Sequence, residues 1–534
     1  MRSLAAVAFL FLSLSLSAQN VVDLVSTIAP NAQRVDPGKT TTFVTRVDNF
    51  SVTSARDLRI EFAAQLGTIE RIEAPSFWSC STSGSRGFCS APRLDEDCRC
   101  SRDIRVTVRA NGIREGGSGL LSMRVSNDVT DAYSDNNNAN GVVEIYEWIT
   151  VTNTSDAGEG SLRWAIEQTD HTCAGPCKIA FEIPAPVPQE GWFTIVPETP
   201  LPPITFKDVA LDAATQTEFS GDTNTRGPEV AIDGRRAHRG LEIHSVCEAI
   251  VRGLAIGHFD ENQGLWFASN AQCFDTRWSG PRRLVENSHI GVDPAGNPWP
   301  NLRGMRLDGA VGAIVRDNVI SHNTASGVWQ WHGWSQFTRN VFDGNGASGI
   351  LVGPDATVDI HENTFSNQVH AGVTIIRGNS LADIRRNSMR DNLGLPIDWG
   401  IDGVSPVEDD DSLIGETNAP VLLSAHYDAA QDVTIVSGRL VSSRIGPYGN
   451  AFHVELFANR GPDGDGERFL GSGAFGLQMF NSFDVSVRGD WRGSWITATV
   501  TRQHHIFAKP GQPRTEITTE DASTSEMSNA VLVP

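Results

Sequence analysis

The fold is decided by the stretch DNVISHNTASGV (residues 317–328) and by three related stretches that follow it, RNVFDGNGASGI (339–350), ENTFSNQVHAGV (362–373) and RNSMRDNLGLPI (386–397). The second residue of each stretch is an asparagine, at Asn318, Asn340, Asn363 and Asn387, with spacings of 22, 23 and 24 residues. A glycine series runs out of phase with it, at Gly304, Gly327, Gly349, Gly372 and Gly394. A period of this length, with short β-type segments between turns, is typical of a solenoid whose coils stack.

The residues that follow the glycines predict which side chains fill this solenoid. The first and third positions after each glycine are nearly always apolar, and the pairs are Leu241/Ile243, Leu265/Phe267, Met305/Leu307, Ile350/Val352 and Val373/Ile375. We expect these side chains to point into the lumen and to stack from coil to coil about 4.8 Å apart. The recurring asparagines predict tight turns, with left-handed backbone geometry and ladders of side chains.

Length and charge limit the class of protein. A chain of 534 residues is too long for one compact core and predicts two to four domains. The formal charge is −21, from 43 basic and 64 acidic residues. A surface this acidic repels phosphate backbones and matches anionic lipid poorly, so nucleic acid is not an expected partner.

The first residues have the pattern of a secretory signal. Met1-Arg2 is followed by an apolar run over residues 4–16 and by Ser17-Ala18-Gln19, which predicts a signal peptide over residues 1–18. No other apolar run approaches the roughly 20 residues of a membrane span. We therefore expect a secreted, extracellular or cell-surface protein without membrane insertion after signal cleavage.

An exported protein enters an oxidising environment, so we expect the eight cysteines to form disulfides. The local groups favour the pairs Cys80–Cys89, Cys173–Cys177 and Cys247–Cys273, which leave Cys98 and Cys100 as a fourth pair. A zinc site built from Cys98, Cys100 and the two earlier thiols is the alternative, although its spacing fits no standard zinc knuckle.

Both flanks of the solenoid alternate with the two-residue period of half-buried strands. Residues 20–145 predict a β-sandwich, and VDLVSTIAP, WSCSTSGSRGFC and SDNNNANGVVEI within them resemble the immunoglobulin-like repeats of bacterial surface proteins. That resemblance implies a spacer or stalk. Residues 417–534 predict a second sandwich, and TSEMSNAVLV resembles the end of the domain that commonly follows the β-helix group described next.

The middle of the chain resembles exported bacterial right-handed parallel β-helix proteins. The phrase ITVTNTSDAGEGSLRWAIEQTD (149–170) is similar to the segment in which, in those proteins, a strand and a short amphipathic helix cover the first coil. The resemblance continues to NLGLPIDWGIDGVSPVEDDD (392–411). The predicted fold is all-β: a right-handed parallel β-helix over residues 146–416, flanked by two β-sandwich (immunoglobulin-like) domains.

Candidate binding residues lie where side chains should face outward from the coils. Positions two and four after the glycines give Trp266, Arg306, Asp308, Trp329 and Trp331, with His332 and Trp334 beside them. Exposed aromatic rings beside polar groups suit the apolar face of a sugar. The alternative is a local bulge that inverts the register and buries Trp329 and Trp331, because Gln330 is an awkward residue for an apolar lumen.

Catalytic and metal-binding residues are less evident. Asp308, with Arg306 as its strand neighbour, is the candidate for catalysis, but glycoside cleavage needs two titratable groups at one bond and no second carboxylate stands out. Asp463, Asp465 and Glu467 place oxygens at alternate positions and are the candidates for Ca²⁺; a solvated turn is the alternative.

These features give two hypotheses of different class. The first is a structural or adhesive protein, without enzymatic activity, that contacts an extracellular glycan or a surface protein through the outer face of the β-helix. The second is a polysaccharide-active enzyme, a lyase or a glycoside hydrolase, that uses the same face. The fold does not decide between them, because solenoids of this kind host many functions.

Overall fold

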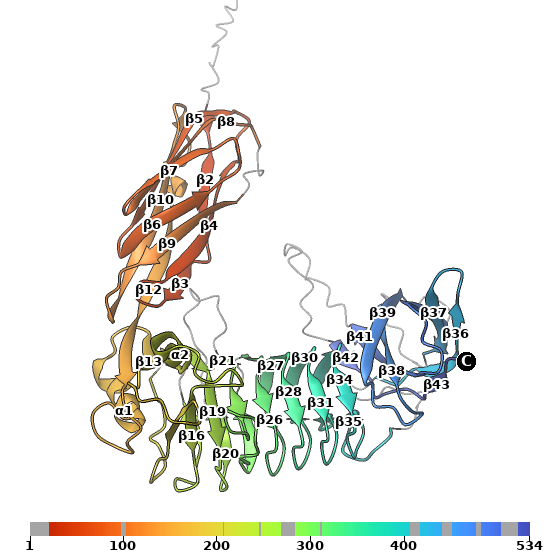
Figure 1. Cartoon of the computed structure of the whole chain (residues 1–534). Coiled ribbons are helices and arrows are strands. Elements are labelled where there is room, and N and C mark those ends of the chain that lie inside the picture. The colour runs from red at the N-terminus through yellow and green to blue at the C-terminus, as the bar shows by residue number, and fades with distance from the viewer. Residues whose placement is uncertain are drawn as a thin grey trace, which may run out of the picture. The chain divides into compact units, whose positions relative to one another are not determined.

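The structure, a computed structural model, describes residues 21–97, 103–206, 208–244, 247–268, 283–309, 312–405, 417–440, 451–476, 482–503 and 522–534 (Figure 1). The described residues form two compact units, one up to Tyr146 and one from Glu147 onward. The predicted signal peptide lies outside the described residues.

The first unit is an antiparallel β-sandwich. One sheet has the order β2 (Leu24–Ala29), β4 (Thr40–Asn49), β9 (Ile104–Ala110), β6 (Gly67–Glu73). The other has the order β12 (Asn138–Val151), β10 (Glu115–Ser126), β5 (Ala55–Ala64), β8 (Arg86–Leu94), β7 (Ser79–Ser83), with β3 (Ala32–Val35) beside β12. Three small elements complete it: β1 (Val21–Val22), which pairs with β11 (Thr130–Asp131), and the 3₁₀ turn η1 (Ser134–Asn137). Alternate side chains of these strands, Phe43 and Phe62 among them, fill the core.

The second unit begins with a parallel β-helix made of three sheets. Sheet 1 contains β13 (Cys177–Phe181), β15 (Asp208–Asp212), β18 (Glu248–Arg252), β21 (Arg283–Glu286), β24 (Ala313–Arg316), β27 (Gly333–Thr338), β30 (Ala356–His361) and β33 (Leu381–Arg385). Sheet 2 contains β14 (Phe193–Ile195), β16 (Val230–Asp233), β19 (Leu254–Gly257), β22 (His289–Ile290), β25 (Val319–Ile320), β28 (Val341–Asp343), β31 (Thr364–Ser366) and β34 (Ser388–Arg390). Sheet 3 contains β17 (Leu241–Ile243), β20 (Gln263–Phe267), β23 (Arg303–Leu307), β26 (Val328–Gln330), β29 (Ile350–Val352), β32 (Val373–Ile375) and β35 (Ile397–Trp399).

The lumen is filled as the glycine series predicts. All ten residues of the five predicted pairs are at most 3% exposed. In sheet 2, Phe342 and Phe365 stack with their ring centroids 4.8 Å apart. This packing confirms the parallel β-helix.

Two columns of amide side chains run along the solenoid inside its turns. In the first, the Nδ2 atoms of Asn318, Asn340 and Asn363 each donate to the Oδ1 atom of the next member, ending at Asn387, at 2.9 to 3.0 Å. The second column contains Asn301, Asn323, Asn345, Gln368 and Asn392. The predicted side-chain ladder is therefore confirmed, and a second one accompanies it.

The predicted left-handed geometry of the ladder asparagines is wrong. The residues with positive φ are the ones immediately before them, Asp317, Arg339, Glu362 and Arg386. Each asparagine needs its side chain inside the turn to reach the next coil, whereas its predecessor can point a charged side chain outward. Two of these outward residues form a bidentate ion pair, in which Arg339 donates to Asp317 at 2.8 Å.

Two helices lie near the first coils. α1 (Leu162–Thr172) is the predicted amphipathic helix; Ser161 caps it by accepting from Trp164 N at 3.2 Å, and its apolar side chains join the lumen core. α2 (Ala214–Ser220) follows β15. Because α1 covers apolar residues of the first coils, it has the covering role that the resemblance implies.

Charged residues on sheet 1 form a chain of ion pairs across neighbouring coils. Asp212 accepts from Lys178 Nζ at 2.9 Å and from Arg252 at 3.2 Å, and Arg252 also donates to Glu286 at 2.6 Å. Glu286 accepts in turn from Arg316. Lys178 and Asp212 are almost fully buried, so each depends on its partner for charge compensation.

The second unit ends with a β-sandwich. One sheet has the order β36 (Val421–Asp428), β37 (Val433–Arg439), β40 (Ser482–Arg488). The other has the order β39 (Arg468–Gly476), β38 (Ala451–Asn459), β41 (Trp495–Gln503), β42 (Ala522–Thr524), with β43 (Val531–Leu532) also on β41.

This sandwich covers the last coil of the β-helix with oxygen acceptors. Glu455 accepts from Arg386 N at 2.8 Å, Asp465 accepts from Asn392 N at 3.2 Å, and Glu526 accepts from Trp399 N at 3.1 Å. Thr524 accepts from Ile384 N at 2.8 Å. The backbone donors of an open parallel sheet are thus satisfied by side chains of the adjoining sandwich.

Two of the predicted disulfides are present, Cys80–Cys89 and Cys173–Cys177. Cys247 is also disulfide-bonded. Its predicted partner Cys273 and the predicted pair Cys98–Cys100 lie outside the described residues.

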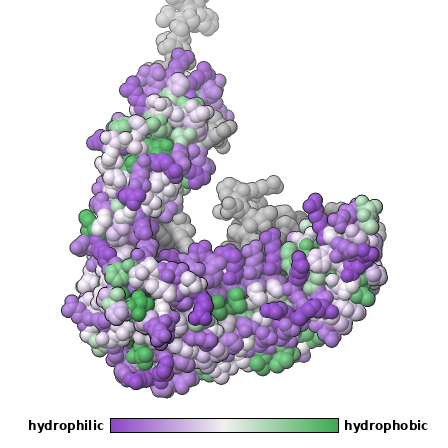
Figure 2. All heavy atoms as spheres, in the orientation of Figure 1, coloured by the Kyte–Doolittle hydropathy of each residue, from purple (hydrophilic) through white to green (hydrophobic). Residues whose placement is uncertain are grey.

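The surface is mainly hydrophilic on the face that Figure 2 shows, with small separate apolar areas. Within the described part of the chain, no helix is both long and apolar enough to cross a membrane.

Candidate functional site

The outward residues of sheet 3 form one column, as the glycine spacing predicts. Parallel pairing places Glu242, Trp266, Arg306 and Trp329 side by side on β17, β20, β23 and β26. The column continues with Leu351, Thr374 and Asp398 on β29, β32 and β35. Two tryptophans and an arginine therefore lie on neighbouring coils, one strand spacing apart.

Arg306 lies between the two tryptophans. Its guanidinium carbon is 5.2 Å from the ring centroid of Trp266 and 4.9 Å from that of Trp329, and the guanidinium of Arg303 is 5.0 Å from the Trp329 ring. Asp308 fixes this arrangement, because it accepts from Arg306 Nε at 3.0 Å and from Trp266 Nε1 at 2.9 Å. Cation–π contacts and one carboxylate thus hold the rings in place.

Trp331 and His332 follow β26 and connect it to β27 of sheet 1, so they extend the column toward that sheet. Trp331 meets Trp329 edge-on, with ring centroids 5.1 Å apart, and His332 lies 5.3 Å beyond it. His332 is fixed by a contact of 3.1 Å between Nδ1 and Pro354 O. We call Trp266, Arg306, Trp329, Trp331 and His332 the tryptophan strip; all five are partly exposed.

Gln330 explains how the strip keeps its register. Its side chain is buried in the lumen, where Oε1 accepts from Ser335 Oγ at 2.7 Å and Nε2 donates to His332 O at 2.5 Å. Since these partners satisfy the amide, no bulge is needed, and β26 stays in register with β23 and β29. Trp329 therefore points outward, half-buried by the two arginines.

Trp334 lies on sheet 1 rather than in the strip. It is part of β27, its ring packs against Gly312, and its indole N–H donates to Asp359. A side chain at position 312 would collide with the ring, so the glycine makes room for Trp334.

Asp359 and Asp383 form a carboxylate pair that the sequence reasoning missed. They are directly paired on β30 and β33, face outward from the lumen, and are 6% and 1% exposed. Asp383 accepts from Arg385 Nε at 2.5 Å and lies 3.6 Å from His361 Nε2. Both carboxylates precede a ladder asparagine by four residues, so the asparagine period contained the signal that places them together.

The two carboxyl groups differ in their affinity for a proton. Burial and the nearby charge of Asp383 raise the pKa of Asp359 to about 6. Burial acts in the same direction on Asp383, but the hydrogen bonds from Arg385 and the nearby His361 outweigh it and lower the pKa of this carboxyl. At pH values below about 6 the pair holds one protonated and one ionised carboxyl side by side, which is the arrangement that acid–base chemistry requires.

The candidate calcium ligands do not converge. Asp465 accepts from Asn392 N, and burial raises its pKa to about 6. Glu467 accepts from Arg460 Nε at 2.8 Å, and Asp463 is exposed. No group of three or more metal-ligating side chains occurs among the residues that the structure describes. Asp465 and Glu467 thus have partners at the junction with the last coil, and a Ca²⁺ site stays a prediction.

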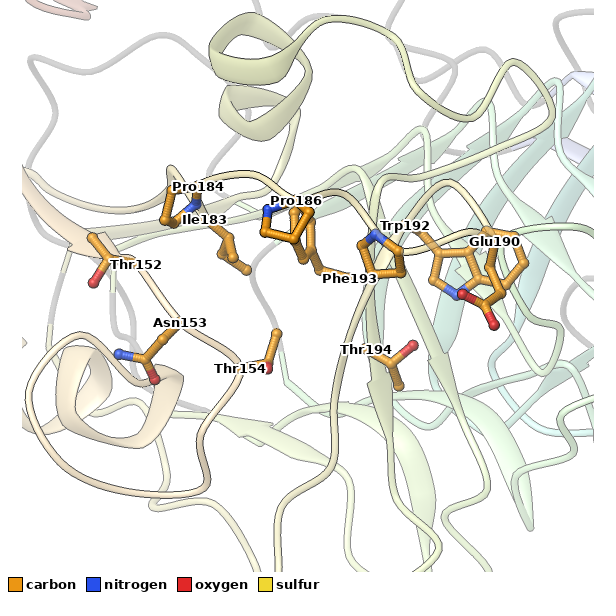
Figure 3. Close-up of a pocket in the computed structure, with 11 residues that line it drawn as sticks. Thr152, Asn153, Thr154, Ile183, Pro184, Pro186, Glu190, Trp192, Phe193 and Thr194 are labelled. Carbon is orange, nitrogen blue, oxygen red and sulfur yellow. The ribbon is translucent and has the colours of Figure 1, made fainter.

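A hollow of about 550 Å³ lies near the first coils, away from the strip (Figure 3). Pro184, Pro186 and Trp192 supply apolar surface, and Thr154 and Glu190 supply polar groups. Asn153, at one end, donates its amide to Glu159 O and stabilises its own turn. None of the predicted site residues lines this hollow.

Comparison with known proteins identifies part of the chain. Residues 283–400 match the family of right-handed β-helix regions, which gives the handedness of the solenoid. No curated protein sequence matches the chain.

Three solved structures illustrate the remaining likenesses. A CARDB domain from Pyrococcus furiosus is 13% identical (24% of this chain, 99% of that one, TM-score 0.16). A non-cellulosomal cohesin from Archaeoglobus fulgidus is 13% identical (23% and 91%, TM-score 0.16). The cohesin CaCohA2 from Clostridium acetobutylicum is 12% identical (24% and 92%, TM-score 0.17).

Proposed function

We propose that this is an exported β-helix protein, secreted or held at the cell surface, that binds an extracellular glycan along the tryptophan strip. The observation that carries the proposal is the row of partly exposed aromatic rings with Arg306, Asp308 and His332 between and beside them. Aromatic faces take the apolar side of a sugar ring, while charged and imidazole groups bond its hydroxyls.

Trp331 is the main platform in this proposal. Arginines lie over the rings of Trp266 and Trp329, whereas no cation lies over Trp331 within the described part of the chain. Its contacts to Trp329 and His332 are edge-on and hold the ring in one orientation. A rigid ring orders a ligand at low entropic cost.

The test is retention of the full-length protein on immobilised polysaccharides, compared with Trp331→Ala. We expect Trp331→Ala to weaken retention at least tenfold, since a stacked ring contributes roughly 1–3 kcal/mol to contacts of this kind. Trp491→Ala is the matched control, because Trp491 is also partly exposed but lies in the C-terminal sandwich. Equal retention of the two variants would remove the strip from the binding surface.

A second function, polysaccharide cleavage, is favoured by the carboxylate pair on sheet 1. Asp359 would give a proton to the leaving oxygen, and Asp383 would act as the base or nucleophile. The purified protein would be incubated with acidic and neutral polysaccharides, with and without Ca²⁺, and new chain ends would be counted. Turnover lost in Asp359→Asn supports cleavage at this pair, whereas turnover lost only in Asp308→Ala would place the chemistry on the strip.

A further inference from the structure

The surroundings of Trp329 contain more hydrogen-bond donors than acceptors. Arg303 makes no ion pair with any residue that the structure describes, and its guanidinium lies over the face of Trp329. The indole Nε1 of Trp329 is buried and has no hydrogen-bond partner within the described part of the chain. Asp308, the carboxylate on this part of sheet 3, is already occupied by Arg306 Nε and Trp266 Nε1.

The charge of Arg303 is also in an electrostatically unfavourable place. Burial lowers the pKa of its guanidinium, and the adjacent Arg306 lowers it further. A guanidinium keeps its proton at any physiological pH, so the cost is borne as unfavourable electrostatic energy rather than relieved by deprotonation. Two guanidinium groups lie over the indole ring of Trp329, and one of them, that of Arg306, is paired with the carboxylate of Asp308. The site therefore has a local excess of positive charge, although the whole chain carries a net charge of −21.

We propose that this place is an anionic subsite, in which Arg303, Arg306 and Trp329 Nε1 bind the carboxylate or sulfate of an acidic sugar residue. The inference rests on the proposed glycan binding and names the class of glycan. Arginine presents a planar fork of donors that matches a carboxylate or sulfate group. The bound anion would supply an acceptor to Arg303 and to Trp329 Nε1 and a second one to Arg306, and the neighbouring Trp331 would take the next sugar ring.

The overall negative charge does not oppose such binding at physiological salt. Charges more than about 8 Å apart are largely screened there, so the local excess of arginine decides the interaction. Within the column, the carboxylates are Glu242 on β17 and Asp398 on β35, and each lies three strands away from Trp329.

The experiment measures affinity of the full-length protein for three acidic polysaccharides, hyaluronan, alginate and chondroitin sulfate. Each is compared with its own carboxyl-reduced or desulfated form. We expect at least one acidic polymer to bind tenfold or more tightly than its neutralised form, and Arg303→Gln to abolish that preference. Trp329→Phe, which keeps a ring but removes the N–H, should weaken binding of the acidic form about three- to tenfold.

Arg226→Gln is the matched control, since Arg226 is an exposed arginine outside the strip. Melting curves establish that each variant is folded. Binding that does not distinguish acidic from neutralised polymers, or a preference that survives Arg303→Gln, overturns the anionic subsite but leaves glycan binding intact. Binding to none of the acidic or neutralised polymers overturns both.

Discussion

Replacement of Asn340 by alanine tests how much the amide columns stabilise the solenoid. The Nδ2 group of Asn340 donates to Val315 O at 2.8 Å and to Asn363 Oδ1 at 2.9 Å. Its Oδ1 accepts from Asn318 N at 3.1 Å and from Asn318 Nδ2 at 2.9 Å. The substitution removes all four bonds inside a site that is 1% exposed.

The cost follows from the groups that are left behind. Val315 O and Asn318 N lose this partner in a place that water does not reach, and each buried unpaired group costs roughly 1–3 kcal/mol. We therefore expect a loss of about 3–5 kcal/mol in the local free energy of opening of these coils.

Native-state hydrogen exchange is the suitable assay, because a chain of several domains does not unfold in one step. Amides of residues 313–343 should exchange on the order of 10²–10³-fold faster in Asn340→Ala, since every 1.4 kcal/mol is a factor of ten. Asn379→Ala is the control, because that exposed side chain makes one bond, to Asp355 Oδ1 at 2.8 Å. An acceleration below tenfold in Asn340→Ala would refute the reasoning.

Three further predictions concern the second unit. Burial raises the pKa of Asp465 to about 6, above the ordinary aspartate value near 4. Protonation of Asp465 therefore stabilises the folded protein as pH falls from 6 toward 4, and this stability is lost as pH rises through 6. Asp465→Asn should therefore raise the melting temperature at pH 7.5 and have little effect at pH 4.5; equal effects at both values would contradict this. Lys178→Met leaves the buried Asp212 without its closest cation and should cost about 3–5 kcal/mol in the local free energy of opening measured by hydrogen exchange at β13 and β15, and a loss below about 1 kcal/mol would show that Arg252 suffices. Phe365→Ala should cost about 3–5 kcal/mol because the ring stacks on Phe342 in the lumen, while Phe365→Leu should cost less than about 1.5 kcal/mol; similar losses would argue against the stack.

The period of the sequence predicted the solenoid because each coil must bury apolar side chains at the same positions of its strands. The residues one and three positions after the glycines are apolar, with Gln330 as the exception, since their side chains face the lumen, and all ten residues of the five predicted pairs are buried. The same register predicted Trp266, Arg306 and Trp329 in one column, where the structure has them. Alternation of side chains along a strand carries that much information.

What the sequence did not reveal depends on contacts between coils. Asp359 and Asp383 are 24 residues apart, and their pairing is visible only when sheet 1 is aligned by the asparagine column. Gln330 looked misplaced in an apolar lumen because its partner, Ser335, lies on the following strand, β27 of sheet 1. The role of Asp465 depends on Asn392, more than 70 residues earlier in the chain, and a calcium motif was the local interpretation of the same residues.

The amide columns have a consequence for how such a molecule changes in length. In the first column, Asn340 and Asn363 each donate to the next asparagine and accept from the previous one, so the partners on both sides are of the same residue type. A duplicated segment of one period would therefore extend the column without leaving an unpaired asparagine side chain at either end of the insertion. Only the final rung is unique, because it must match the carboxylates of the sandwich that closes it. Insertions and deletions of whole coils should consequently be tolerated anywhere between the helix-covered first turns and that closing rung, and loss of part of a coil should not.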